Sequence, residues 1–326
     1  MQPTNEFVRV PSNSNRNLSD SSTSLSEDDW DFLIKRIRGG KCTPFLGAGA
    51  SQPSISLAKD MAVALAKKYE YPFAISENDL AKVTLFMAIK QGDPIWPKEQ
   101  LLSEFFQNVN PPDFNNPTQL LRVLAELPLP VYMTTNYDSF MMQALQSVRM
   151  SDGEKKKPRR ELCKWNDVKW ESIWDKERGY RPTEAEPVVY HFHGMDEVPE
   201  SLVLTEDDYI AFLVNTSRDP DLLPPFMEAS ITSCSLLFLG YSLSDVTFQV
   251  IFRGLISSMD SGLRRLSLAV QLPPEADEST RKGAQDYLNS YYSKQNVRVY
   301  WGTAEQFGKD LYERLHKTPM SKPGNP

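Results

Sequence analysis

The chain has 326 residues, of which 40% are hydrophobic and 24% charged, a globular composition with enough length for one large domain or two smaller ones. Its 36 basic and 43 acidic side chains give a net charge of -7, so the chain as a whole does not attract nucleic acid or an anionic membrane. Three dispersed cysteines without a CxxC pair, the lack of a leader pattern and apolar runs shorter than the roughly 18 residues of a membrane span favour a cytoplasmic protein without disulfides.

The two ends of the chain are poor in apolar residues. Residues 1–25 are rich in Ser, Asn and Asp, so we expect a flexible arm there and a flexible tail over 319–326. Ser26 and Asp29 form a capping-box pattern ahead of an apolar periodicity that stops at a Gly-Gly pair, which predicts a first helix. We therefore expect the ordered domain to cover 26–318.

A glycine-rich segment, GAGAS, follows the apolar run Thr43–Leu46 and precedes a helical pattern over Leu57–Tyr69. A strand, a Gly-x-Gly turn and a helix allow backbone N–H groups to approach a diphosphate, and the helix N-terminus adds partial positive charge. Gly47, Gly49 and Ser51 are therefore candidate phosphate contacts. The motif is weak by itself because Gly-x-Gly also occurs in ordinary turns, and the missing third glycine of the dehydrogenase fingerprint disfavours hydride transfer.

Two segments depart from the strand and helix alternation. Residues 72–128 show several helical patterns with proline-rich breaks, which predict a helical insertion or lid. Residues 151–187 are polar and basic, and we interpret them as a loop-rich excursion. The basic run Lys155–Arg160 indicates a solvated loop rather than a nucleic-acid site, and the three tryptophans in this segment indicate packing or a subunit contact.

The remaining segments alternate between short apolar runs and helical patterns. We predict strands over 130–136, 188–194, 202–204, 235–242, 266–272 and 297–301, and helices over 137–146, 206–213, 245–256, 276–291 and 304–316. Parallel strands need crossover helices, so the pattern predicts an α/β fold with a doubly wound, mostly parallel, Rossmann-like sheet.

Polar clusters stand at the predicted ends of three further strands: TTNYD at 134–138, HG at 193–194 and GYSLSD at 240–245. Ligands of doubly wound sheets gather at the carboxyl ends of strands, so we expect the clusters to share one cleft. Structural roles remain open: Asn136 can cap the next helix, Asp138 can complement its dipole, and His191, two residues before His193 on one predicted strand face, competes for its role.

The ordered motifs GAGAS, TTNYD, HG and LGYSLSD resemble the sirtuin superfamily, in particular the divergent Sir2-like group of bacterial anti-phage defence, over roughly residues 40 to 250. The resemblance implies a site for NAD. It assigns the NAD phosphates to Gly47, Ala48, Gly49 and Ser51, the nicotinamide ribose to Asn136, Asp138 and His193, and the adenosine side to Gly240, Ser242 and Asp245.

The departures from the deacetylase pattern narrow the implied activity. Thr135 stands where deacetylases carry Gln, the Asp-Phe-Arg segment is missing, and the two zinc-binding CxxC pairs are absent. We therefore expect an NAD glycohydrolase that forms nicotinamide and ADP-ribose without a metal. In this hypothesis Asn136 orients the ribose and the attacking water, and neutral His193 accepts a proton. An NAD-dependent protein deacylase and a non-catalytic sensor of NAD or ADP-ribose remain alternatives.

The same resemblance implies a place in defence. It predicts an NAD-depleting effector that is controlled by assembly, since unregulated cleavage of NAD is toxic to the cell that makes the enzyme. We expect a homo-oligomer and a partner such as a HerA-type ATPase or a short Argonaute, without a membrane or direct nucleic-acid contact. The oligomer size, the trigger, the activity of the isolated chain, cyclic ADP-ribose formation and the choice between NAD and NADP stay open.

Overall fold

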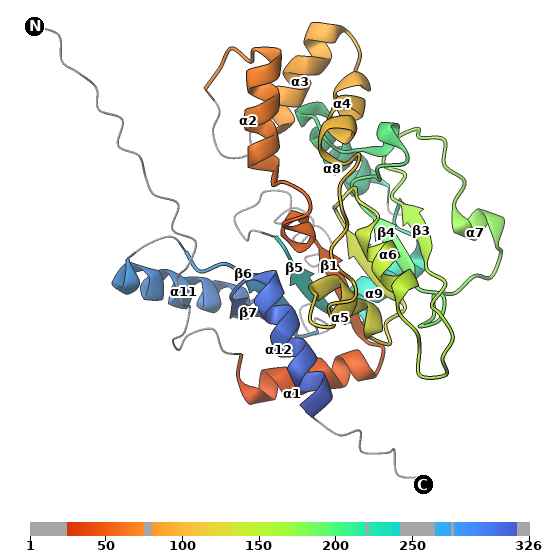
Figure 1. Cartoon of the computed structure of the whole chain (residues 1–326), viewed down its shortest axis with the longest axis vertical. Coiled ribbons are helices and arrows are strands. Elements are labelled where there is room, and N and C mark those ends of the chain that lie inside the picture. Colours follow the sequence, from red (N-terminus) through yellow and green to blue (C-terminus); the bar gives the residue numbers. More distant parts are fainter. Residues whose placement is uncertain (1–24, 75–79, 220–221, 242–264, 275–276, 318–326) are drawn as a thin grey trace, which may run out of the picture.

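A computed structural model describes residues 25–74, 80–219, 222–241, 265–274 and 277–317 (Figure 1). Within these ranges seven strands form one parallel sheet between two layers of helices. The predicted doubly wound α/β class is therefore confirmed. The predicted arm (apart from Leu25), the predicted tail, the predicted helix over 245–256 and the candidate residues Ser242 and Asp245 lie outside the described residues.

The sheet has the strand order β3-β4-β2-β1-β5-β6-β7, and every neighbouring pair is parallel. Its strands are β1 (Cys42–Leu46), β2 (Val131–Thr134), β3 (Arg159–Leu162), β4 (Val188–His191), β5 (Ser235–Leu239), β6 (Ser267–Gln271) and β7 (Val297–Trp301). From β1 the chain first builds the sheet toward β3, then returns to β5 on the other side of β1. The topological switch point, where such sheets bind ligands, therefore lies at the carboxyl ends of β1 and β5.

The described helices cover both faces of this sheet. They are α1 (Glu27–Arg38), α2 (Ala58–Tyr69), α3 (Leu80–Gln91), α4 (Trp96–Phe105), α5 (Leu120–Glu126), α6 (Phe140–Ser147), α7 (Ile173–Lys176), α8 (Glu206–Arg218), α9 (Pro225–Thr232), α11 (Glu278–Ser293) and α12 (Ala304–Lys317), with short 3₁₀ helices η1 (Ala48–Ser51) and η2 (Pro199–Ser201). The first begins as predicted, because Ser26 and Asp29 form the capping box.

Alternation of side chains along the strands separates two hydrophobic clusters. In β1 and β5, Leu46 and Leu237 belong to one cluster, together with residues of α1, α5, α6 and α12. Phe45 and Phe238 belong to the other, together with residues of α8, α9 and α11. Successive side chains of a strand point to opposite faces, so strands buried on both faces read as continuous apolar runs.

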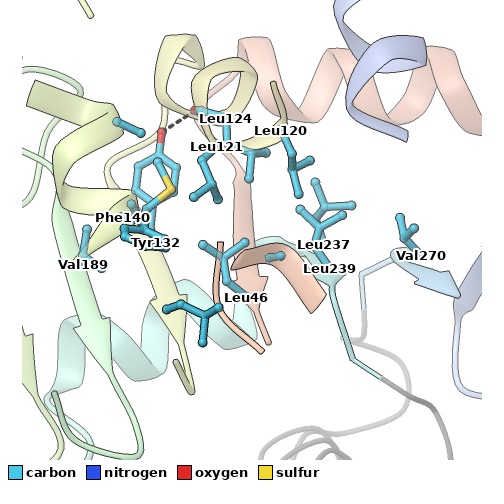
Figure 2. Packing of buried hydrophobic residues seen from close by; sticks show 14 of the residues in the cluster. Leu46, Leu120, Leu121, Leu124, Tyr132, Phe140, Val189, Leu237, Leu239 and Val270 are labelled. Carbon is cyan, nitrogen blue, oxygen red and sulfur yellow. Dashed lines mark hydrogen bonds between the residues drawn. The ribbon is translucent and has the colours of Figure 1, made fainter. Parts of the chain in front are cut away.

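Helix α5 belongs to the layer that covers the sheet. Figure 2 shows its leucines over the strand residues Leu46, Leu237 and Leu239, and the hydroxyl of Tyr132 donates to the carbonyl of Leu124 at 2.9 Å. The helices α2, α3 and α4 stand together at one end of the molecule (Figure 1). Of the segment 72–128 that we interpret as an insertion, α3 and α4 therefore form the projecting part and α5 forms part of the core.

The segment 151–187 contains a strand that the sequence did not predict. Strand β3 forms the edge of the sheet and pairs with β4, in the register Arg160 to Val189 and Leu162 to His191. The interpretation of the basic run as a solvated loop is wrong for two of its cations. The Lys156 side chain is buried and donates to the carbonyl of Leu127 at 2.6 Å, and the Arg160 side chain is 8% exposed and pairs with Asp196 at 2.8 Å.

The tryptophans of this segment pack and anchor it, as predicted. Trp165 donates its indole N–H to the carbonyl of Ser201 at 2.8 Å, and Trp170 donates to the buried carboxylate of Glu161 at 2.6 Å. The predicted short strand at 202–204 is not a strand in the structure. It is an extended connection whose Val203 N–H donates to the carbonyl of His193 at 2.9 Å.

Candidate active site

The glycine turn leaves β1 as predicted, but an α-helix does not follow it directly. Gly47 precedes the 3₁₀ helix η1, and α2 begins only at Ala58. The prediction that a helix N-terminus adds positive charge at the turn is therefore wrong for α2. The helix predicted over Leu57–Tyr69 is confirmed as α2, whose N-cap residue is Leu57.

The glycines bring the ends of β1 and β5 into contact. The N–H of Gly47 donates to Leu239 O at 2.8 Å, and that of Gly49 donates to Gly240 O at 2.9 Å. A Cβ on Gly240 would lie 2.3 Å from the backbone nitrogen of Ala50, and Gly240 has a φ of +77°. The N–H groups of Gly47 and Gly49 are thus already hydrogen-bonded within the protein. Contacts from these two groups to a diphosphate stay a prediction, which requires those hydrogen bonds to break.

The second motif forms a hydrogen-bonded network with the glycine turn. Asn136 Nδ2 donates to Gly47 O at 3.0 Å and to Ser51 Oγ at 2.9 Å, and Ser51 Oγ donates to Asp138 Oδ2 at 2.7 Å. A backbone carbonyl can only accept, so the amide nitrogen of Asn136 must face Gly47. Both N–H groups of the amide are used, which leaves Oδ1 as the group that Asn136 can offer to a ligand.

Asp138 links this network to the start of helix α6. Its Oδ1 accepts the N–H of Phe140 at 2.9 Å, at the start of α6, whose N-cap residue is Ser139. Burial raises the pKa of the Asp138 carboxyl, although its bonds to Ser51 and Phe140 act in the opposite direction. The structural role considered for Asp138 is therefore present, whereas Asn136 does not cap the helix.

The two neighbouring histidines point into different surroundings. His193 is 3% exposed, and its ring meets Phe212 edge-on with centroids 5.0 Å apart. Its Nε2 is buried and has no hydrogen-bond partner in the part of the chain that the structure describes. Burial lowers the pKa of His193 to about 3, so the imidazole is neutral at pH 7. His191 instead contacts Asn136 O through Nδ1 at 2.9 Å.

The expectation that the two histidines share a strand face is wrong. Strand β4 ends at His191, and the chain then turns toward Gly194, which has a φ of +84°. The alternation of a strand does not continue through this turn. As a result, His193 lines a cavity at the switch point of the sheet, whereas His191 lies behind Asn136.

One cavity of about 170 Å³ at the switch point brings most of the predicted residues together. Six predicted residues line it: Ala48, Ser51, Asn136, Asp138, His193 and Gly240. Ten lining residues were not among the candidates: Ile55, Ser56, Ala58, Met61, Leu80, Phe106, Thr135, Tyr137, Tyr209 and Tyr241. Thr135, Tyr137 and Tyr241 stand inside the recognised motifs, so their positions were available from the sequence. Phe106 and Tyr209 come from distant helices and carry no comparable signal.

The described ranges contain neither a cluster of metal-ligating side chains nor a helix that could span a membrane. In those ranges, groups of three or more His, Cys, Asp or Glu side chains that could hold a metal ion are not found. The thiols of Cys42, Cys163 and Cys234 are free. Among the same residues, every helix is too short or too polar to cross a bilayer.

Acidification from pH 7 to pH 5 is expected to weaken the fold. Burial keeps His193 neutral in the folded protein, and burial together with the charge of Arg160 also lowers the pKa of His191. The unfolded histidines bind protons below about pH 6.5, so the stability falls as the pH falls, by at most about 1.4 kcal/mol per histidine for each pH unit. The raised pKa of the Asp138 carboxyl has the opposite effect on stability, because the folded protein binds this proton more readily than the unfolded chain does.

Urea unfolding of the wild type and of His193→Gln at both pH values measures this effect. The variant is expected to lose less stability on acidification, because one of the two neutral histidines has been removed. An equal loss in both proteins would show that His193 titrates normally in the folded state.

The fold and the cavity define a Rossmann-like α/β protein whose site is built from a glycine turn, an Asn-Ser-Asp network and a buried neutral histidine. The SIR2-like domain model matches residues 130–300, just over half of the chain, and the chain belongs to this family.

Curated relatives carry the same printed name. The "NAD(+) hydrolase ThsA" of Bacillus cereus (strain MSX-D12) is 26% identical over 233 residues, which cover 68% of this chain and 43% of the relative. The protein of that name from Acinetobacter baumannii (strain 532279) is 26% identical over 221 residues, which cover 66% of this chain and 39% of the relative. The chain thus spans about two-fifths of the length of these relatives.

A solved structure titled "Structural Basis for the Mechanism and Regulation of Sir2 Enzymes" covers 89% of this chain and 98% of its own, with 13% identity and a TM-score of 0.37. That score is too low to define a shared fold by itself.

Proposed function

We propose that this chain is an NAD glycohydrolase, which cleaves the bond between nicotinamide and ribose and forms ADP-ribose. The observation that carries the proposal is the convergence of Asn136 and His193, from separate motifs, on one cavity at the switch point of the sheet. The relatives named NAD(+) hydrolases, which align with about two-thirds of the chain, support it.

The chemistry requires little acid catalysis. Nicotinamide is cationic in NAD, so it leaves with the electron pair of its bond to C1′, and C1′ becomes an oxocarbenium-like centre. The oxygen of water then bonds to C1′ and one proton is released. The protein mainly positions the reactants and stabilises charge.

We assign different parts of this work to Asn136 and His193. Asn136 is held by Gly47 and Ser51, so its Oδ1 can accept a hydrogen bond from the attacking water or a ribose hydroxyl. His193 is neutral and its Nε2 lacks a partner, so a hydroxyl brought to this atom supplies its missing hydrogen bond. An anionic group of the bound substrate near the imidazole would raise the pKa of His193 and favour proton transfer to it.

The size of the cavity assigns it to one end of the substrate. Pockets that enclose drug-sized ligands have volumes of about 300–1,000 Å³, whereas this cavity has about 170 Å³. We assign it to the nicotinamide and its ribose, among the aromatic side chains of Phe106, Tyr137 and Tyr209. Gly240, Ser242 and Asp245 stay the sequence-based candidates for the adenosine side.

The family resemblance extends the proposal to a biological role. We propose a cytoplasmic NAD-depleting defence effector that acts as a homo-oligomer under the control of a partner, with a HerA-type ATPase or a short Argonaute as precedents. The arrangement of the basic run disfavours direct nucleic-acid binding. Lys156 is buried, the Arg160 side chain is 8% exposed and pairs with Asp196, and Arg159 pairs with Glu177 at 2.9 Å.

Incubation of the purified chain with NAD, in the presence of an acetyl-lysine peptide, tests the proposal. Chromatography is expected to show equal amounts of nicotinamide and ADP-ribose, with the peptide unchanged. Removal of the acetyl group would establish the deacylase alternative. Binding of NAD without turnover would favour either the sensor alternative or an enzyme that is inactive until its partner binds. The absence of both binding and turnover would contradict all three activities.

A further inference from the structure

The edge strand β3 places a charged side chain directly behind the second motif. Arg160 Nε lies 3.1 Å from His191 Nε2, and His191 Nδ1 lies 2.9 Å from the carbonyl oxygen of Asn136. Arg160 is 8% exposed in its side chain and His191 is fully buried. Neither residue lines the cavity at the switch point. The pair therefore reaches Asn136 only from the side away from the substrate position.

The chemistry of the donors fixes the tautomer of His191. The Nε of an arginine can only donate, so Nε2 of His191 must accept. The ring proton consequently resides on Nδ1 and is donated to Asn136 O. Burial and the neighbouring charge of Arg160 hold the pKa of His191 well below its ordinary value, so the imidazole keeps this neutral form.

Arg160 also holds the next peptide group. Arg160 Nη2 donates to Tyr137 O at 3.0 Å and to Asp196 Oδ1 at 2.8 Å. The N–H of Asp196 donates to the same carbonyl of Tyr137 at 2.9 Å. Two successive carbonyls, those of Asn136 and Tyr137, are thus bound from one side. Strand β2 has ended at Thr134, so the hydrogen bonds of the sheet do not hold these carbonyls.

We propose that Arg160 and His191 are positioning residues, which fix the backbone after β2 so that the Asn136 amide faces Gly47 and Ser51. The consequence for catalysis rests on the proposed NAD glycohydrolase activity. The positioning of Asn136 by Arg160 and His191 does not rest on that activity, because it concerns the orientation of the Asn136 amide alone. A shift of the order of 1 Å in a group that orients substrate can lower a rate by roughly a hundredfold.

A matched pair of variants tests this assignment. His191→Asn keeps an N–H donor at the position of Nδ1, whereas His191→Gln places its amide at the position of Nε2 and loses the donor to Asn136 O. We expect kcat for NAD cleavage to fall by roughly a hundredfold in His191→Gln, with KM changed by less than about threefold, and His191→Asn to restore most of the rate. Equal rates in the two folded variants would overturn the assignment.

Two measurements judge the assignment even if the chain does not cleave NAD. Crystal structures are expected to show the Asn136 amide displaced from Ser51 in His191→Gln and retained in His191→Asn. The ¹⁵N spectrum of the wild-type imidazoles is expected to show His191 protonated at Nδ1. A wild-type His191 protonated at Nε2, or an undisplaced Asn136 in His191→Gln, would refute the positioning role independently of the proposed function.

Discussion

Replacing His193 with alanine is expected to lower kcat for NAD cleavage by roughly 10²- to 10⁴-fold, the range that general acid–base groups contribute. His193 combines three properties that suit a proton acceptor: it lines the cavity with Asn136, its imidazole is neutral, and its Nε2 lacks a partner. Nicotinamide release under saturating NAD measures the effect.

A loss of folding must be distinguished from a loss of catalysis in this experiment. Alanine leaves a space beside Phe212, which the imidazole contacts at 5.0 Å between centroids. His193→Gln retains more of the volume but lacks a basic nitrogen, so it is expected to be comparably inactive and more stable. His316 is exposed and bonds to Tyr312 O at 2.8 Å on α12, so His316→Ala serves as the control with wild-type activity. A folded His193→Ala variant with wild-type kcat would exclude the histidine from the mechanism.

Gly240→Ala is expected to lower the free energy of unfolding by about 2–5 kcal/mol, from backbone strain and overpacking together. Gly240 has a φ of +77°, and an added Cβ would lie 2.3 Å from Ala50 N and 2.7 Å from Gly47 O. These are backbone atoms, so relief requires the glycine turn to move. The same movement distorts the base of the cavity, and NAD cleavage is expected to fall as well.

Gly283→Ala is the matched control for this substitution. Gly283 is exposed within α11, and a Cβ at this position meets nothing within 4 Å. Alanine should therefore stabilise the protein by about 0.5–1 kcal/mol through helix propensity and a less flexible unfolded chain. Urea denaturation of both variants decides the matter. A Gly240→Ala protein as stable as Gly283→Ala would mean that β1 and β5 do not approach each other as closely as described.

The features that the sequence predicts well are those with a local cause. Apolar runs such as Leu236–Leu239 are buried on both faces of a parallel sheet, so they indicate the central strands without further information. The polar residues that follow these runs converge because carboxyl ends of parallel strands share one edge. Asn136 and His193 were therefore predictable as neighbours in one cavity.

The features that were missed depend on partners far away in the sequence. Strand β3 reads as charged, yet Glu161 is buried because Trp170, Ser172 and the Ile173 N–H donate to its carboxylate at 2.6–2.7 Å. Local sequence does not reveal such compensation, and an isolated charged segment is normally solvated. The role of Arg160 was missed for the same reason, because its interactions with His191 and Asp196 form only when β3 pairs with β4.

The contact between the glycine turn and β5 also bears on synthesis of the protein. Gly47 and Gly49 emerge early from the ribosome, but their N–H groups donate to Leu239 and Gly240, which are translated much later. Until β5 has been made and has paired with β1, the base of the cavity is missing, although β1, β2 and β4 are already available. In a nascent chain the glycine turn and β5 can therefore close the base of the cavity only after β5 has left the ribosome, so this site forms later than the strands β1, β2 and β4.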